Sequence, residues 1–382
     1  MNTSIFDTFE PTCLPVELLA IAFFTSFIVV LLSTPSLIKV AKLKHLVDEP
    51  KEERKLHRTS IPTIGGIIIF AGTLFSLALW IPAEPARQGG NFWAVVKAFN
   101  EFKYITAALL ILFFIGVKDD IIGTAPMKKL LGHIIVAFIL VLMADVRIHS
   151  MHGLFGLHEI PDYASIGLSL FAYIVIVNAF NLIDGVDGLA AGIGLICSVV
   201  FGIWFYMADV MTFAVLGFVL AGALLGFLIF NFSPARIFMG DSGSLVIGAV
   251  ISILAVRMIE TNPAKVPEVF ENVSTPVFAM AVLVYPLVDT LRVFFYRAVK
   301  GISPFSADRN HIHHNLLSLG MTHGQTVMIL YLFNLLVVAG AVSTAGMNPT
   351  AAWVLLFVIV LVVVNIPGML LYRKQRVPTS KA

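Results

Sequence analysis

Carboxylates and histidines interrupt an otherwise apolar chain at a few short segments. Asp119 and Asp120 are adjacent, Asp184 and Asp187 are three residues apart, and Asp241 stands in a glycine-rich stretch. Neighbouring carboxylates repel each other unless a cation or a shared proton lies between them. Mg²⁺ takes one or two carboxylates together with water and substrate phosphates. The acidic segments therefore predict a magnesium site for phosphate chemistry, and a solvated or capped helix end is the structural alternative at each of them.

Basic residues form a second group. His311, His313 and His314 follow Arg309 closely, and His57-Arg58 forms a basic pair nearer the N-terminus. Imidazoles beside an arginine suit phosphate binding or proton transfer. Binding of zinc is an alternative, although no cysteine and no His-x3-His spacing accompanies the cluster. A solvated loop is a third interpretation.

Polar residues also gather between 178 and 189. Asn178 and Asn181 lie three residues apart before Asp184, and Gly185 allows a ligand to approach the backbone. A polar turn between two helices is the alternative. Asp289 stands inside an apolar segment, where an ionisable group is functional by default, or pairs with Arg292 or Arg297.

Composition indicates a membrane protein. Of the 382 residues 58% are hydrophobic and 13% are charged, and the mean hydropathy is +0.93. A soluble core cannot bury so much apolar surface. The net charge of +2 gives no reason to expect nucleic-acid binding, and the two cysteines are too few for a disulfide framework.

About 20 apolar residues cross a bilayer as a helix. The sequence predicts an all-α polytopic membrane protein of about eleven such helices, in one domain over residues 1–382 with a basic tail at 372–382. The predicted spans are residues 16–40, 62–81, 102–117, 129–144, 164–182, 188–207, 211–231, 242–259, 275–298, 325–343 and 351–371.

Lysine and arginine predict the orientation, because they concentrate in cytoplasmic loops. Alternate loops and the C-terminal tail hold 19 of the 25 basic residues, including Lys128 and Lys129 at the start of the fourth span. The N-terminus is thus expected outside and the C-terminus in the cytoplasm. The acidic and histidine segments all fall on the cytoplasmic side, so we expect them to meet there.

Such a meeting of carboxylates, a divalent cation, a glycine-rich helix start and Arg or His donors suits a diphosphate. The chain has no Walker A sequence, which argues against an ATP-driven pump. An ion- or proton-coupled transporter is the rival class, and it would place ionisable groups near the middle of the bilayer, often in repeated halves.

The chain resembles the polyprenyl-phosphate N-acetylhexosamine-1-phosphate transferases, and within them the bacterial enzymes that use UDP-GlcNAc and undecaprenyl phosphate. The matching pieces are Asp119-Asp120, residues 178–189, residues 238–244 and residues 303–314. The sequence His-Ile-His-His at 311–314 is the most discriminating, since the related phospho-MurNAc-pentapeptide translocases carry three consecutive histidines in this loop.

The resemblance implies residue roles. Asp241 would be a principal Mg²⁺ ligand, with Mn²⁺ as an alternative ion, and Asp119 and Asp120 would lie close to it. Asp184 and Asp187 would line the cleft between nucleotide and metal. The remaining implied contacts to uridine, diphosphate or sugar are Asn178, Asn181, Gly185, Phe238, Arg309, His311, His313 and His314, with His57 and Arg58 as weaker matches.

The resemblance also implies the reaction and its setting. GlcNAc 1-phosphate would pass from UDP-GlcNAc to undecaprenyl phosphate in the bacterial cytoplasmic (inner) membrane, at a site facing the cytoplasm, as the first lipid-linked step of a surface polysaccharide such as O-antigen or teichoic acid. Direct attack by the lipid phosphate and a covalent aspartyl intermediate both remain open. So do another UDP-HexNAc donor and a homodimer.

Overall fold

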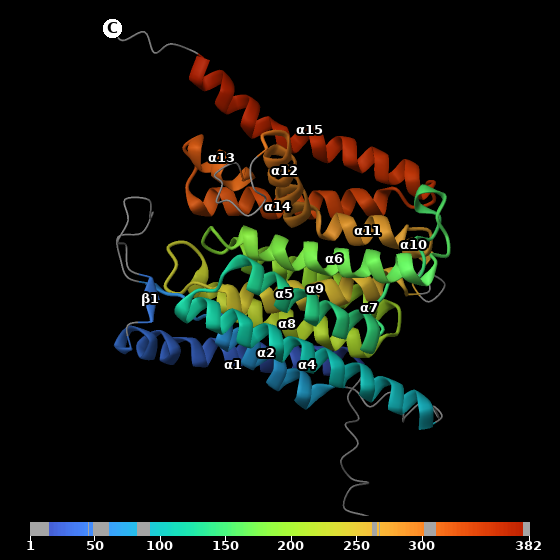
Figure 1. Ribbon diagram of the computed structural model, residues 1–382, viewed down its shortest axis with the longest axis horizontal. Coiled ribbons are helices and arrows are strands. Elements are labelled where there is room, and N and C mark those ends of the chain that lie inside the picture. Colours follow the sequence, from blue (N-terminus) through green and yellow to red (C-terminus); the bar gives the residue numbers. More distant parts are fainter. Residues whose placement is uncertain are drawn as a thin grey trace, which may run out of the picture.

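The structure is a computed structural model that describes residues 15–44, 46–48, 61–81, 92–261, 266, 268–301 and 311–376. Most helices run side by side along one common direction, with α1 on one side of the bundle and α15 on the other, whereas α12 stands across that direction (Figure 1). The only strands in the described ranges are β1 (Val47–Asp48) and β2 (Ile61–Pro62), which pair antiparallel. The described fold is therefore helical, as expected, apart from one antiparallel pair of two-residue strands.

The long helices are α1 (Pro15–Leu43), α2 (Gly66–Trp80), α4 (Phe92–Ile122), α5 (Pro126–Phe138), α6 (Asp162–Ile183), α7 (Leu189–Met207), α8 (Met211–Asn231), α9 (Asp241–Ile259), α14 (His323–Ser343) and α15 (Pro349–Arg376). The other helices are α10 (Glu268–Glu271), α11 (Thr275–Val282), α12 (Val284–Val299) and α13 (Ile312–Ser318). A π-turn at Ile139–Met143 extends α5, and a 3₁₀ turn covers Leu154–Gly156.

Each of the eleven predicted spans falls on a helix or helix pair. Within the described ranges, eight helices are long and apolar enough to cross a membrane, or nine if the bent pair α11–α12 is one span. The helix α2 is shorter, and α4 is not among the eight. The polytopic membrane architecture is confirmed, and the number eleven stays a prediction.

The helix α9 lies at the centre of the bundle. It packs against α6, α4, α7 and α2, and nearly all of its residues are buried. Two close approaches fix its first turn: a Cβ on Gly66 would lie 2.0 Å from the Gly243 nitrogen, and one on Gly116 would lie 2.4 Å from the Ser242 Cα. Any side chain at these two positions would push α2 or α4 away from α9, so the glycines set where α9 begins.

The pair α11–α12 bends by 77° around Leu283. Pro286 has no N–H to donate to the Val282 carbonyl one turn earlier. Asn334 of α14 replaces the lost bond, since its amide nitrogen donates to the Val282 carbonyl at 3.1 Å and its oxygen accepts from the Tyr285 nitrogen at 3.3 Å. A buried amide thus stabilises a break that lipid would not tolerate.

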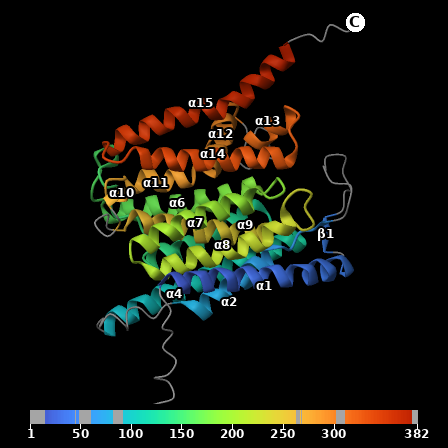
Figure 2. The ribbon, with the colours of Figure 1, turned by 180° about the vertical axis from the view of Figure 1, so that it is seen from behind.

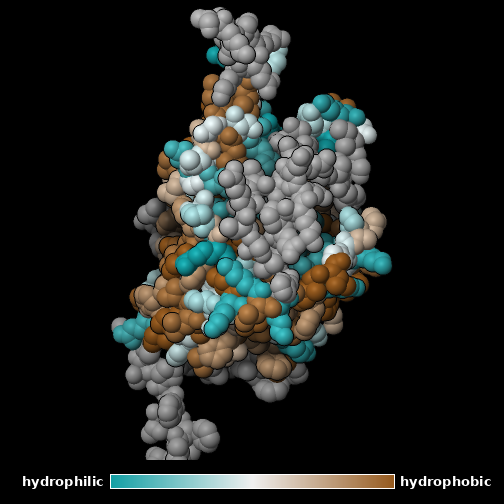
Figure 3. All heavy atoms as spheres, turned by 90° about the vertical axis from the view of Figure 1, so that its left-hand side faces the viewer, coloured by the Kyte–Doolittle hydropathy of each residue, from teal (hydrophilic) through white to brown (hydrophobic). Residues whose placement is uncertain are grey.

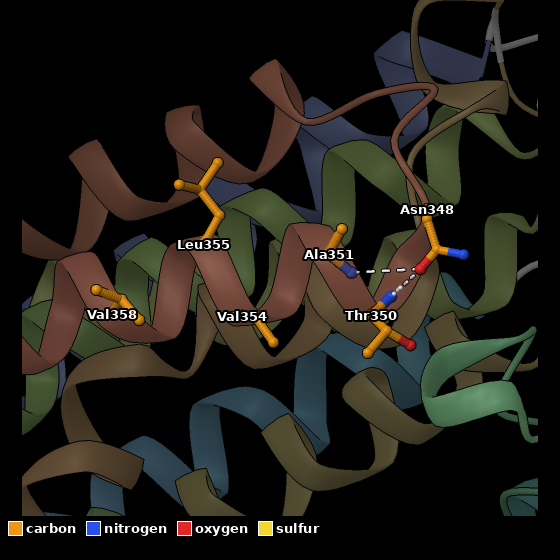
Figure 4. A pocket seen from close by; sticks show the side chains of 6 residues that line it. All are labelled: Asn348, Thr350, Ala351, Val354, Leu355 and Val358. Carbon is orange, nitrogen blue, oxygen red and sulfur yellow. Dashed lines mark hydrogen bonds between the residues drawn. The ribbon is translucent and has the colours of Figure 1, made fainter.

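The end of the bundle away from the acidic motifs has its own ion pairs. Arg257 pairs with Glu101, Arg147 with Asp162 at 3.3 Å, and His149 with Glu260 at 3.1 Å. The helix α15 starts at this end, where the Asn348 side chain accepts from the Thr350 and Ala351 nitrogens (Figure 4). A pocket of about 640 Å³ beside this start is mainly apolar, and none of its lining residues is a predicted site residue.

Candidate active site

The first turn of α9 is capped by a carboxylate from another helix. Asp120, at the end of α4, accepts from the Asp241 and Ser242 nitrogens at 2.6 and 3.0 Å and from the Ser242 hydroxyl at 2.6 Å. Gly240 precedes this turn with φ at +71°. Burial raises the pKa of Asp120 to about 6, against the opposing effect of the Ser242 hydrogen bonds. Asp120 therefore joins α4 to α9 and neutralises the positive end of the α9 dipole.

Lys129, in the first turns of α5, occupies a position that oxygen atoms surround. Its ammonium lies 3.4 Å from Asp119 Oδ2 and 3.4 Å from Asn181 Oδ1, and it also contacts Asp241 Oδ2. Asn181 in turn donates to Asp241 Oδ1 at 2.8 Å. Three oxygen atoms from three helices thus converge on one cation, and an all-oxygen donor set is the set that Mg²⁺ prefers.

The turn after α6 is tied to the loop before α9. The Gly240 nitrogen donates to Asp184, and the Ala235 nitrogen donates to Asp187 Oδ2 at 3.1 Å. Burial raises the pKa of Asp184 well above its usual range, and the charges of Asp120 and Asp187 add to that effect. Burial thus favours the protonated form of Asp184 more than in an ordinary aspartate, whereas Asp187, which is buried, supports the loop.

Two of the three histidines are held through Nδ1 by residues of α12. His311 Nδ1 lies 2.7 Å from Asp289 Oδ2, and His313 Nδ1 lies 3.1 Å from the Tyr285 hydroxyl. A carboxylate only accepts, so His311 donates from Nδ1 and its Nε2 is left for other partners. The pKa of His313 falls to about 3 because burial disfavours its charged form. His314 is half-buried, and its ring centroid lies 4.4 Å from that of His313.

The histidines adjoin the acidic turn. A Cβ on Gly185 would lie 3.9 Å from His313 Nε2, which places this imidazole edge beside the Asp184–Gly185 backbone. Asp289, His311 and His313 are the one compact group of three metal-ligating side chains within the described ranges, and all three are buried. Zinc, the alternative ion for the histidine cluster, thus has a geometric candidate site, although the Nδ1 atoms of both histidines already have hydrogen-bond partners.

The structure brings together most of the predicted site residues. Asp119, Asp120, Asn181, Asp184 and Asp241 share one network, and Figure 3 shows hydrophilic side chains gathered across the middle of that end of the molecule, between apolar ones. β1 and α13 lie at the same end (Figure 2). The acidic residues and the histidines of the predicted site therefore lie at the same end of the bundle. Their catalytic and metal-binding roles remain predictions.

Other predicted residues are placed differently. The Asn178 amide donates to the Ile174 carbonyl of its own helix at 2.7 Å. Phe238 contributes backbone, since its nitrogen donates to the Pro62 carbonyl at 2.7 Å and its carbonyl accepts from the Gly65 nitrogen at 3.0 Å. His57, Arg58 and Arg309 lie outside the described residues.

Sequence reasoning missed three contributors. Lys129 counted only toward the orientation, although its position at a span start shortly after Asp119-Asp120 was a usable signal. Ser242 and Tyr285 gave no signal, because a serine at a helix start and a tyrosine in a span are ordinary. Asp289 was singled out; it accepts from His311 and the Ile312 nitrogen, and His313 Nδ1 lies 3.8 Å from its Oδ2.

The carboxylates of the acidic motifs lie at helix ends, at the end of α4, after α6 and at the start of α9, whereas a transporter would place them at mid-span. Asp289 lies within α12. Comparison with known proteins also indicates an enzyme and not a transporter. Residues 102–259 match the family described as Glycosyl transferase family 4.

Three relatives match over most of their length. The decaprenyl-phosphate N-acetylglucosaminephosphotransferase of Mycobacterium tuberculosis is 34% identical over 88% of this chain and 84% of its own. The undecaprenyl-phosphate alpha-N-acetylglucosaminyl 1-phosphate transferase of Escherichia coli K12 is 30% identical over 85% and 83%. A probable undecaprenyl-phosphate N-acetylglucosaminyl 1-phosphate transferase of Bacillus subtilis is 29% identical over 91% and 89%. The chain therefore belongs to glycosyl transferase family 4, as a membrane phosphosugar transferase of the polyprenyl-phosphate N-acetylhexosamine-1-phosphate transferase superfamily.

Proposed function

We propose that this enzyme transfers GlcNAc 1-phosphate from UDP-GlcNAc to undecaprenyl phosphate, giving undecaprenyl-diphospho-GlcNAc and UMP. The observation that carries the proposal is the convergence of Asp119, Asp241 and Asn181 on one cation position beside Asp184 and the histidines. The names of the relatives support GlcNAc as the sugar, and they include both undecaprenyl and decaprenyl phosphate as lipids.

In the proposed reaction, an oxygen of the lipid phosphate forms a bond to the β-phosphorus of the nucleotide. The bond between the β-phosphorus and the bridging oxygen breaks, and UMP leaves with that electron pair. Asp184, whose pKa burial raises, is suited to take the proton of the lipid phosphate. His311 and His313 offer their Nε2 edges to the diphosphate oxygens.

We assign the metal position to Asp119, Asp241 and the Asn181 carbonyl oxygen, where the Lys129 ammonium now lies. Mg²⁺ bound there, or Mn²⁺ in its place, would neutralise the diphosphate charge. Asp120, a predicted ligand, would act mainly by holding Asp241 in place, because three donors from α9 already occupy its oxygens. Asp187 would hold the loop that carries Gly240.

The proposed setting is the bacterial cytoplasmic membrane with the site open to the cytoplasm, where a nucleotide sugar would be available. The basic loops support this orientation. The product would be the first lipid-linked intermediate of a surface polysaccharide.

The test is release of UMP by the purified protein with Mg²⁺ and undecaprenyl phosphate, across a panel of UDP-sugars. UDP-GlcNAc is expected to give the highest kcat/KM, and EDTA is expected to stop turnover. Release from a different UDP-HexNAc alone would keep the reaction and change the donor. Absence of UMP with every donor would reject the proposal. If a covalent aspartyl intermediate forms, acid quenching during turnover with a donor labelled in its phosphosugar would leave the label attached to the protein.

A further inference from the structure

A second pocket, which contains charged and polar side chains, lies between α12 and α15. Its volume is about 430 Å³, within the range of ligand pockets, and its lining is Arg292, Asn365, Gly368, Met369, Tyr372 and Arg373. Two guanidinium groups, a phenol and an amide therefore share one cavity. None of these residues belongs to the predicted active site.

Specific contacts hold Arg292 in the wall of the pocket. Arg292 of α12 is half-buried, and with the Asn315 amide turned to suit its neighbours, the Asn315 oxygen accepts from both Arg292 terminal nitrogens at 3.1 and 3.2 Å. A Cβ on Gly368 would lie 3.6 Å from Arg292 Nη2. This stretch of α15 therefore lies directly against the Arg292 guanidinium, and a side chain larger than a methyl group at Gly368 would extend into the pocket.

Exposed apolar side chains stand close to the pocket residues along α12 and α15. Phe295 of α12 is 73% exposed and Met369 of α15 is 63% exposed, and Leu291 and Leu370 are exposed beside them. In a membrane these side chains contact lipid. Tyr372 and Arg373 follow the apolar stretch of α15, at the position where a spanning helix meets the headgroup layer. The pocket thus combines basic side chains with exposed apolar side chains on the same two helices, which are suited to acyl chains.

We propose that this cavity binds the phosphate headgroup of an anionic phospholipid, with the acyl chains lying along α12 and α15. Guanidinium groups recognise phosphate through paired hydrogen bonds, and basic pockets between membrane helices on the cytoplasmic side suit anionic headgroups. Arg292 and Arg373 would contact the phosphate, and Tyr372 would lie at the headgroup.

The site adjoins the histidine cluster through shared elements. Asn315, which holds Arg292, stands on α13 one residue after His314, and Asp289, which holds His311, lies one turn before Arg292 on α12. A lipid bound to Arg292 would therefore fix α12 and α13 relative to each other, and with them His311 and His313.

Binding can be tested without turnover. The full-length protein, purified in a neutral detergent and stripped of lipid, would be titrated with phosphatidylglycerol, phosphatidylcholine, inorganic phosphate or undecaprenyl phosphate. Native mass spectrometry would count bound lipids and thermal unfolding would report stabilisation. Phosphatidylglycerol is expected to bind and stabilise, and Arg373→Gln should weaken it about fivefold. Gly368→Leu, which fills the cavity, should remove one bound lipid.

Matched variants separate the cavity from general effects. Lys42→Gln removes an exposed basic residue at the end of α1, and Gly167→Leu adds a side chain to α6 where no atom lies within 4 Å. Both should bind as the unaltered protein does. Equal binding of phosphatidylcholine, unchanged affinity in both Arg373→Gln and Gly368→Leu, or stabilisation by inorganic phosphate alone would overturn the proposal. Loss of undecaprenyl phosphate binding alone in these variants would assign the cavity to the substrate lipid and also overturn it.

Discussion

At the scale of single residues, the site depends on side chains that hold other side chains. Asp289 is buried and accepts from His311 Nδ1 and the Ile312 nitrogen, both at 2.7 Å. It is a positioning residue in the same sense as the carboxylate that orients the histidine of a hydrolase triad. Its removal would free the imidazole to rotate and to change tautomer.

Asp289→Asn should lower kcat about a hundredfold with little change in KM, because the substrates still bind while His311 is no longer oriented. Asp289→Glu should recover part of the loss, and the pH profile of kcat should shift in Asp289→Asn. UMP release measured across pH tests this. The control is Asp162→Asn at the opposite end of the bundle, which should be neutral. An unshifted profile with normal kcat in Asp289→Asn would remove the residue from the site.

His313 should contribute a pH dependence to stability. Its pKa in the folded protein is about 3, below its ordinary value of 6.5, because it is buried. The groups that face it are Tyr285 and Asp289 of α12, His311, His314 of its own helix and His323 of α14. Between these two pKa values the unfolded chain binds a proton at His313 and the folded chain does not. The contribution of His313 to the free energy of unfolding is therefore complete above pH 6.5 and is lost as the pH falls toward 3.

The difference between the protein and His313→Gln isolates that contribution. As the pH falls from 6.5 to 5, the free energy of unfolding of the unaltered protein should decrease faster, by up to about 1 kcal/mol per pH unit. Thermal unfolding of both proteins in detergent at several pH values would measure it. Parallel curves for the two proteins would show that His313 accepts its proton in the folded state at an ordinary pKa.

At the scale of elements, the start of α9 decides the geometry of the acidic site. Asp120 reaches it from α4, Gly66 and Gly116 allow α2 and α4 to approach it, and Asn181 of α6 binds Asp241. Three helices thus fix one helix end, and the charge of Asp120 complements the α9 dipole.

Asp120→Ala should therefore lower stability as well as activity. Loss of a helix cap costs about 1–2 kcal/mol, and the exposed donors of the α9 turn would add to it. Asp119→Ala, which removes a neighbour that contacts Lys129 and no α9 donor in the described structure, should reduce UMP release with a smaller fall in the unfolding temperature. Equal unfolding temperatures for the two variants would contradict the cap.

At the scale of the whole molecule, the two ends of the bundle differ in chemistry. One end holds the acidic site, the histidines and the basic cavity, and the other holds the pairs Arg257–Glu101 and Arg147–Asp162. The positive-inside bias predicts that the first end faces the cytoplasm.

Cysteine accessibility tests that orientation. In a background with Cys13→Ser and Cys197→Ala, Gly123→Cys and Phe155→Cys would each be treated with a membrane-impermeant maleimide in intact spheroplasts. Phe155→Cys should be labelled at once, and Gly123→Cys only after permeabilisation, because the two exposed positions lie at opposite ends of the bundle. The reverse pattern would invert the topology and move the site to the outer face.

The sequence alone determined that the protein lies in a lipid bilayer, that it is helical and which segments carry chemistry, because hydropathy and residue type act locally. Every predicted span falls on a helix or a helix pair, and Asp119, Asp120, Asp184 and Asp241 meet at one end of the bundle. Tertiary structure alone decided which partner each side chain has. Asp120 caps α9, Lys129 lies between Asp119 and Asp241, and Asp289 holds His311, because these contacts join helices whose relative placement depends on packing across the whole bundle.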